Sequence, residues 1–203
     1  MHDGTSIVDS LRNLPDASAV ALKLGEHNYA DNYVNVLQSV LGSFLKEKDI
    51  DCIYVTTTTP SHIILNALTL LEISEKRIYF VDAISHIMMS TESKLDKVLY
   101  VESPTMLENI MLKIEYLMRK LGAGPKMIFI DSLNSMAIHN DTRILAEFLH
   151  ILVNNLRTKH TYTLILVIED PGSEELSNIL NLICDVSIPV RSERSLTNGG
   201  DEK

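Results

Sequence analysis

The sequence predicts a doubly wound α/β fold, in which helices cover both faces of a mostly parallel sheet. Short runs rich in Val, Ile and Leu recur along the chain, and each is followed by a segment whose apolar residues repeat with helical spacing. That alternation is typical of parallel strands joined by crossover helices. Because aromatic residues make up only 5% of the chain and Trp is absent, we expect an aliphatic core.

Seven runs are predicted to form the strands of this sheet. They are Ala19–Leu24, Cys52–Thr57, Arg77–Asp82, Val98–Val101, Met127–Ile130, Leu164–Ile168 and Val186–Val190. We predict one domain over residues 1–190, followed by a polar tail over residues 191–203 that we expect to be disordered.

Helical spacing predicts the crossover segments that join the first three strands. The first helix follows the turn at residues 25–28, and Asn28 or Asp31 is its expected N-cap. The second helix is short and follows a row of threonines, with Ser61 as its expected cap. Both helices therefore begin directly after a strand.

Three further helices are predicted downstream. One opens at Ser103-Pro104 and is ended by Gly122 and Gly124. The next covers Asp141–Thr158, and the last opens at residues 173–175, where two glutamates favour a helix N-terminus.

The segment from Ser85 to Lys97 has mixed composition and no clear period over residues 86–97, which predicts a surface loop. It holds Met88 and Met89, for which two interpretations are open. The pair could form an adhesive patch for a partner or fill gaps in the core, and we favour core burial.

Composition disfavours several classes of function. The formal net charge is -9, and a field of that sign repels phosphate backbones and anionic membranes, so we expect no nucleic-acid partner. No apolar run reaches the roughly 20 residues that a membrane helix needs, and the N-terminus lacks the pattern of a signal peptide. We therefore expect a cytoplasmic protein. Cys52 and Cys184 lie in apolar runs far apart, which indicates buried free thiols.

The ends of the strands are where a doubly wound sheet binds its ligands. The most specific pattern there is four apolar residues, 127–130, closed by Asp131-Ser132. A strand ended by an acid is how P-loop ATPases deliver a carboxylate to magnesium. The alternative is structural, because Asp often follows a strand to accept hydrogen bonds from loop amides.

The order of segments from Ala19 to Val190 resembles the RecA/KaiC-like family of P-loop ATPases, especially its archaeal KaiC-like members. YVTTTTPSHIILNAL at residues 54–68 resembles their second strand and following helix, and RIYFVDAIS at 77–85 resembles their next strand. VLYVESPTMLENI at 98–110 and MIFIDSLNSM at 127–136 resemble the segments up to and including Walker B. The resemblance implies a RecA-like fold, ATP and magnesium as family cofactors, self-association, and Asp131 as the metal-side acid.

The phosphate-binding loop of that family does not appear in this sequence. A working loop reads GxxxxGK[ST], in which amides cradle the phosphates, Lys offsets their charge and a hydroxyl holds magnesium. The corresponding place reads Gly25-Glu26-His27-Asn28, without a Lys, Ser or Thr, and Glu26 would repel a triphosphate. The resemblance also implies a catalytic Glu at the end of the second strand, where this chain has Thr56–Thr59, and threonine is too weak a base.

The missing phosphate-binding loop and catalytic Glu predict a noncatalytic RecA/KaiC-like protein, that is, a pseudo-ATPase without a cofactor. We expect it to bind another protein or itself, in signalling or regulation. The alternative is a nucleotide-binding ATPase with an unorthodox loop, in which amides of residues 25–28 and His27 attract an anion and Asp131 works with Glu102 or Glu169. We expect a homodimer or higher homo-oligomer that uses apolar surface near the vacant site.

Two other kinds of site receive little support from the sequence. Four dispersed histidines show no metal-ligand spacing and are expected on helix surfaces; they are His86, His139, His150 and His160. Ser61 and His62 are adjacent, but neighbours in sequence point in different directions, so a hydrolase triad is disfavoured.

Overall fold

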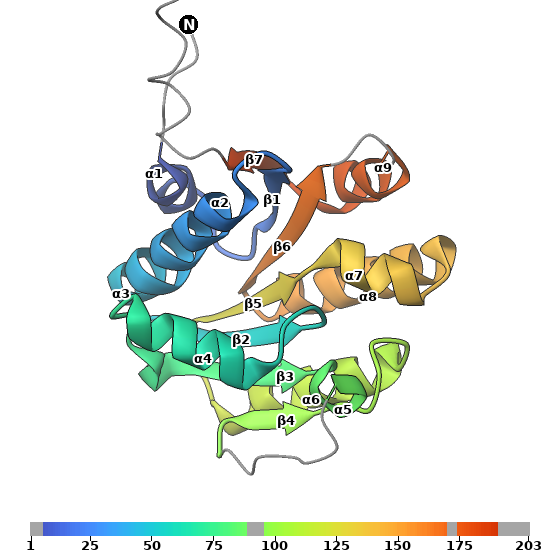
Figure 1. The fold of residues 1–203 in the computed structure, drawn as a ribbon, viewed down its shortest axis with the longest axis horizontal. Helices are drawn as coiled ribbons and strands as arrows, with labels where there is room; N and C mark the ends of the chain where they lie inside the picture. Colours follow the sequence, from blue (N-terminus) through green and yellow to red (C-terminus); the bar gives the residue numbers. More distant parts are fainter. Residues whose placement is uncertain (1–5, 89–95, 170–173, 191–203) are drawn as a thin grey trace, which may run out of the picture.

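The computed structural model describes residues 6–88, 96–169 and 174–190, and over these the chain forms a seven-stranded sheet in which every neighbouring pair is parallel (Figure 1). The strand order is β4-β3-β2-β5-β6-β1-β7. The strands are β1 (Ala19–Gly25), β2 (Asp51–Thr56), β3 (Ile78–Asp82), β4 (Val98–Tyr100), β5 (Lys126–Asp131), β6 (Thr161–Glu169) and β7 (Val186–Val190). The predicted doubly wound α/β fold is confirmed, and so are all seven strands.

Helices cover both faces of the sheet (Figure 1). They are α1 (Ile7–Arg12), α2 (Tyr29–Val36), α3 (Leu45–Lys48), α4 (Ser61–Leu70), α5 (Ser85–Met88), α6 (Leu107–Lys120), α7 (Leu133–His139), α8 (Thr142–Thr158) and α9 (Glu174–Ile183). A π-helical stretch, Leu37–Phe44, joins α2 to α3, and a 3₁₀ turn, Glu75–Arg77, precedes β3.

Two hydrophobic cores lie on opposite faces of the sheet because successive side chains of a strand point to opposite sides. The core on the α6 to α9 side is almost wholly aliphatic, as predicted, whereas the core on the α1 to α4 side also buries five aromatic side chains, so the expectation of an aliphatic core was wrong for that face. On β1, Val20 and Leu22 pack with the α1 to α4 side, whereas Ala19 and Ala21 pack with the α6 to α9 side. The crossover from β1 to β2 passes over β6 and β5, because those two strands lie between them in the sheet. This route places α2 above the end of β5.

The segment predicted as a loop begins with a helix instead. Residues 85–88 form α5, and the Met88 side chain is 64% exposed, so the expectation of core burial for Met88 was wrong. The reason is that α5 is a single turn fixed at the end of β3 through backbone amides of Ile84 and Ser85, which leaves its later side chains in solvent. Met89, residues 191–203 and the predicted opening at Ser173 lie outside the described residues.

Several predicted helix caps also differ from the structure. Ser61 is the first residue of α4 and not its cap; its amide donates to Asp82 Oδ2 at 2.8 Å. Asn28 stands at the N-cap of α2 in a left-handed conformation, but its side chain makes no capping hydrogen bond, and Asp31 lies within the helix. The expectation that Ser103-Pro104 opens a helix was wrong, because Ser103 closes a local turn with Thr105 and α6 starts only at residue 107.

The helix predicted over Asp141–Thr158 and the helix stop predicted at Gly122 are confirmed. Asp141 caps α8 by accepting from the amides of Arg143 and Ile144. Gly122, with φ of +71°, follows the end of α6, where a left-handed residue ends a helix. Cys52 is buried as predicted, and Cys184 is partly buried, with its pKa raised by burial to about 12.

Candidate functional site

The Walker B-like acid, Asp131, ends β5 at the carboxyl edge of the sheet and is only 1% exposed. Its Oδ2 accepts two hydrogen bonds, from the hydroxyl of Tyr33 at 2.6 Å and from that of Tyr54 at 2.5 Å. The two hydroxyl oxygens lie 2.9 Å apart. Tyr33 comes from α2 and Tyr54 from β2, so the three residues tie the crossover helix to the two central strands.

Burial dominates the electrostatics of this cluster. It raises the pKa of Asp131, and the hydrogen bonds from the two tyrosines only partly oppose that effect. Burial and the nearby carboxylate raise the pKa of both Tyr33 and Tyr54, so both hydroxyls keep their protons and act as donors. The other carboxylate oxygen, Asp131 Oδ1, has no hydrogen-bond partner among the described residues.

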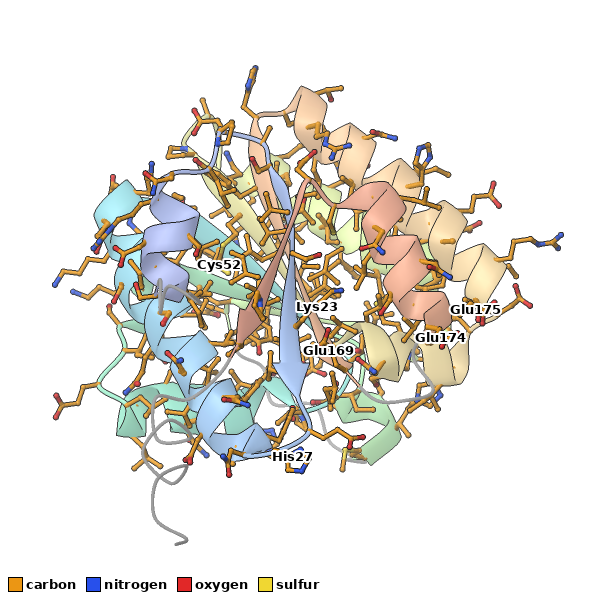
Figure 2. The ribbon with its side chains drawn as sticks, turned by 90° about the horizontal axis from the view of Figure 1, so that it is seen from above. Lys23, His27, Cys52, Glu169, Glu174 and Glu175 are labelled. Carbon is orange, nitrogen blue, oxygen red and sulfur yellow. The ribbon has the colours of Figure 1, made fainter. Side chains whose placement is uncertain are left out.

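The turn that corresponds to the phosphate-binding loop is very short. β1 ends at Gly25 and α2 begins at Tyr29, which leaves only Glu26, His27 and Asn28 between them, all exposed. Figure 2 places His27 at the tip of this turn, beyond the end of β1. The turn is fixed by Asn32, whose Nδ2 donates to the carbonyl of His27 at 3.1 Å. Three residues are too few to wrap a phosphate group in backbone amides.

The threonine row after β2 joins the ends of the two central strands. The amide of Thr57 donates to the carbonyl of Asp131 at 2.8 Å, and its hydroxyl lies 3.2 Å from the carbonyls of both Asp131 and Ser132. The Ser135 hydroxyl donates back to the carbonyl of Thr57 at 2.6 Å. Ser132 is buried and caps α7. The structure thus brings the predicted Asp131-Ser132 pair and the threonines together through structural hydrogen bonds.

A second buried carboxylate, Asp82, ends β3 and has a different environment. Its Oδ1 accepts from the amides of Ile84 and Ser85, and its Oδ2 accepts from the amide of Ser61 and the hydroxyl of Ser85. Burial would raise the pKa of Asp82, but these hydrogen bonds outweigh burial and lower it. Asp82 therefore anchors the starts of α4 and α5 as a fully bonded anion.

The other acids proposed from the sequence lie elsewhere. Glu169, at the end of β6, is paired with Lys23 of β1 at 3.8 Å, and Figure 2 shows both on the side of β1 that faces α9. Glu102 is exposed after β4. Within the described part of the chain, neither glutamate makes a hydrogen bond or ion pair with Asp131, and no three His, Cys, Asp or Glu residues form a group able to hold a metal. His86, His139, His150 and His160 are exposed, as predicted.

The contact of Tyr33 with Asp131 is the feature that the sequence did not predict. Tyr33 lies in the helix that was predicted to follow residues 25–28, and helical spacing says nothing about what its hydroxyl contacts. The one signal available was the occurrence of Tyr29 and Tyr33 one helical turn apart, a spacing at which side chains share a face. In the structure their rings stack, with centroids 5.9 Å apart.

Removing the Tyr33 hydroxyl should weaken the cluster measurably. We expect Tyr33→Phe to lower the free energy of unfolding by about 1 kcal/mol, because one donor to a buried carboxylate is lost while Tyr54 still donates. Urea denaturation measures the change. Tyr29→Phe is the matched control: its hydroxyl makes no hydrogen bond among the described residues, so its effect should be close to zero. Equal effects for the two variants would contradict the role of Tyr33.

Comparison with known proteins agrees with this architecture. A family model described as "ATPase: KaiC" matches residues 41–195. No curated protein matches the sequence. Among solved structures, the chain is similar to a KaiC-like protein from the hyperthermophilic archaeon Pyrococcus horikoshii OT3, with a TM-score of 0.62 and 16% sequence identity, over 89% of this chain and 74% of that one. At that identity the likeness concerns the fold alone. Among the described residues, no helix is long and apolar enough to cross a membrane.

Proposed function

The chain belongs to the KaiC ATPase family, and on that premise we propose that it is a noncatalytic member, which acts in regulation or signalling by binding another protein or a second copy of itself. The observation that carries this proposal is the contact between Tyr33 and Asp131. A carboxylate that serves magnesium must face the phosphates of a bound nucleotide. Here Oδ2 of the Asp131 carboxylate accepts hydrogen bonds from two tyrosine hydroxyls, and Asp131 is buried.

Two further features support the absence of nucleotide chemistry. The three-residue turn after β1 lacks a lysine and carries Glu26, so it supplies neither the cradle nor the counter-charge that a triphosphate needs. The threonines that stand in place of a catalytic base are occupied in joining β2 to β5. The residues present do not fit ATP and magnesium, and we derive no catalytic step through them.

A second candidate function, ATP binding through an unorthodox site, has one observation in its favour. Asp131 Oδ1 lacks a partner, and a buried carboxylate oxygen without a partner is costly unless something binds it. For this candidate to hold, α2 must move so that Tyr33 leaves Asp131. Since that step would break the hydrogen bond from Tyr33 to a buried carboxylate and leave only the one from Tyr54, we favour the noncatalytic function. The net charge of -9 also disfavours a nucleic-acid partner.

Calorimetry with ATP and magnesium tests the proposal. We expect a dissociation constant weaker than about 1 mM, because neither phosphate amides nor a counter-charge are in place. His27→Ala is the matched variant: if weak binding depended on His27 at the tip of the turn, the variant would abolish it. Micromolar binding of ATP would refute the noncatalytic function.

A further inference from the structure

Helix α4 has an unusual composition for a surface helix. It carries no charged residue among its ten residues, although 22% of the chain is charged. Its buried face is formed by Ile64 and Leu68, and yet Ile63 and Leu70 on the other side are 47% and 85% exposed. Asn66, between them, is also exposed. These three residues stand three and four positions apart, so they form one stripe along the outside of the helix, which we call the α4 stripe.

The exposed apolar side chains of α8 are arranged differently. On α8, Ile144 and Ile151 are exposed, but Arg143 and Glu147 share that surface. Isolated apolar side chains among charges are ordinary surface. A stripe with no charge is distinct, because covering it removes apolar area from water without removing a charge.

The α4 stripe is held rigidly at its start. Asp82 accepts from the amide of Ser61, the first residue of α4, and from the amide of Ser85, the first residue of α5. The starts of the two helices are therefore fixed to one carboxylate. α5 adds two more exposed apolar side chains, Ile87 and Met88. A preorganised surface loses little entropy when it binds.

The spacing in the α4 stripe is self-complementary. In two antiparallel copies of α4 related by a two-fold axis near Asn66, Ile63 of one copy meets Leu70 of the other, and the reverse pair forms at the other end. The two Asn66 amides then face each other, and each amide offers both a donor and an acceptor to its equivalent. Two chains that each carry a charge of -9 repel, and that repulsion is least where the facing helices carry no charge.

We propose that α4 is the surface through which two copies of this chain associate, as a two-fold pair with Ile63 packed on Leu70 and Asn66 on Asn66. The partner of the proposed function is then a second copy of this chain, and only the regulatory role of the dimer rests on that proposed function. This surface lies on α4 and not at the vacant nucleotide site.

The size of the surface sets the strength of the association. A ten-residue helix is about 15 Å long. The area that one face of such a helix can bury is smaller than the roughly 800 Å² that each partner contributes to a standard interface. With α5 as an extension the interface remains small. The dimer therefore belongs to the weak class and dissociates in the micromolar range.

Sedimentation equilibrium over about 1 to 200 µM tests the proposal. We expect the mass to rise from 22.8 kDa towards twice that value. Leu70→Lys should raise the dissociation constant at least about tenfold, because it buries a charge at the centre of an apolar contact. Ile151→Lys is the matched control, since it adds the same charge in place of a 50% exposed apolar residue of α8, away from the α4 stripe, and should leave the dissociation constant within about twofold.

A charge pair at Asn66 tests the two-fold arrangement itself. Asn66→Asp and Asn66→Lys should each be monomeric alone, since like charges meet across the axis, whereas an equal mixture should dimerise. A monomeric unchanged chain at every concentration, equal effects of Leu70→Lys and Ile151→Lys, or a mixture no heavier than its components would each overturn the inference. The dimer and the noncatalytic function are tested by different measurements. A chain that dimerises through α4 and also binds ATP would refute the noncatalytic function but not the dimer.

Discussion

Replacing Asp82 with Asn should lower the free energy of unfolding by about 3 kcal/mol. Both oxygens of this carboxylate accept two hydrogen bonds, so whichever position the Asn amide nitrogen takes, it meets N–H or O–H donors that it cannot satisfy. The starts of α4 and α5 then lose their shared anchor. Urea denaturation at neutral pH measures the loss.

Asp141→Asn is the matched control for Asp82→Asn. Asp141 caps α8 through a single oxygen, Oδ1, on the surface, and Asn is as good a cap as Asp. We expect a change of less than about 0.5 kcal/mol. A loss of similar size in both variants would show that the anchoring role assigned to Asp82 is wrong.

The free energy of unfolding of the unmodified protein should also fall at low pH as Asp82 becomes protonated. The folded-state pKa of Asp82 is lowered, so the folded protein binds the proton less tightly than the unfolded chain. The stability that Asp82 supplies is therefore complete above the ordinary carboxyl pKa of about 4 and is lost as pH falls through the lower folded value. Asp82→Asn should lack this part of the acid response.

The strands could be predicted from the sequence because both faces of a parallel sheet are covered, and each strand then appears as an unbroken apolar run. The run at Met127–Ile130 is such a case. Helices α1 and α7 were not predicted, because each has seven residues or fewer, too short to show a reliable helical period. The exposure of Met88 could not be foreseen either, since it depends on where α5 is fixed.

The residues that the candidate site lacks could be predicted from the sequence, but the hydrogen bonds that its acid makes instead could not. The missing lysine and hydroxyl at Gly25-Glu26-His27-Asn28 are visible in the sequence, and so is the acid at Asp131. The hydrogen bond from Tyr33 to Asp131 joins residues 98 positions apart and depends on the path of the crossover over β6 and β5. No local pattern encodes that path. The same holds for the start of α4, where the amide of Ser61 donates to Asp82 at the end of β3.

Replacing Asp131 with Asn should have the opposite effect to the change at Asp82. We expect the free energy of unfolding at neutral pH to rise by about 1–2 kcal/mol, because a buried anion with one unpaired oxygen becomes a neutral group. The Asn carbonyl can still accept from Tyr33 and Tyr54. Urea denaturation, with Asp141→Asn as the surface control, measures this change.

The pH dependence gives the decisive comparison for Asp131. Burial raises its folded-state pKa, so the folded protein binds this proton more tightly than the unfolded chain does. The stabilising contribution of the protonated form is complete below about pH 4 and is lost as pH rises through the folded pKa. Asp131→Asn cannot lose a proton, so its advantage over the unmodified protein should grow with pH across that window. If Asp131→Asn instead cost several kcal/mol at neutral pH, the carboxylate would be needed as an anion, as a magnesium ligand must be, and the noncatalytic function would lose its main support.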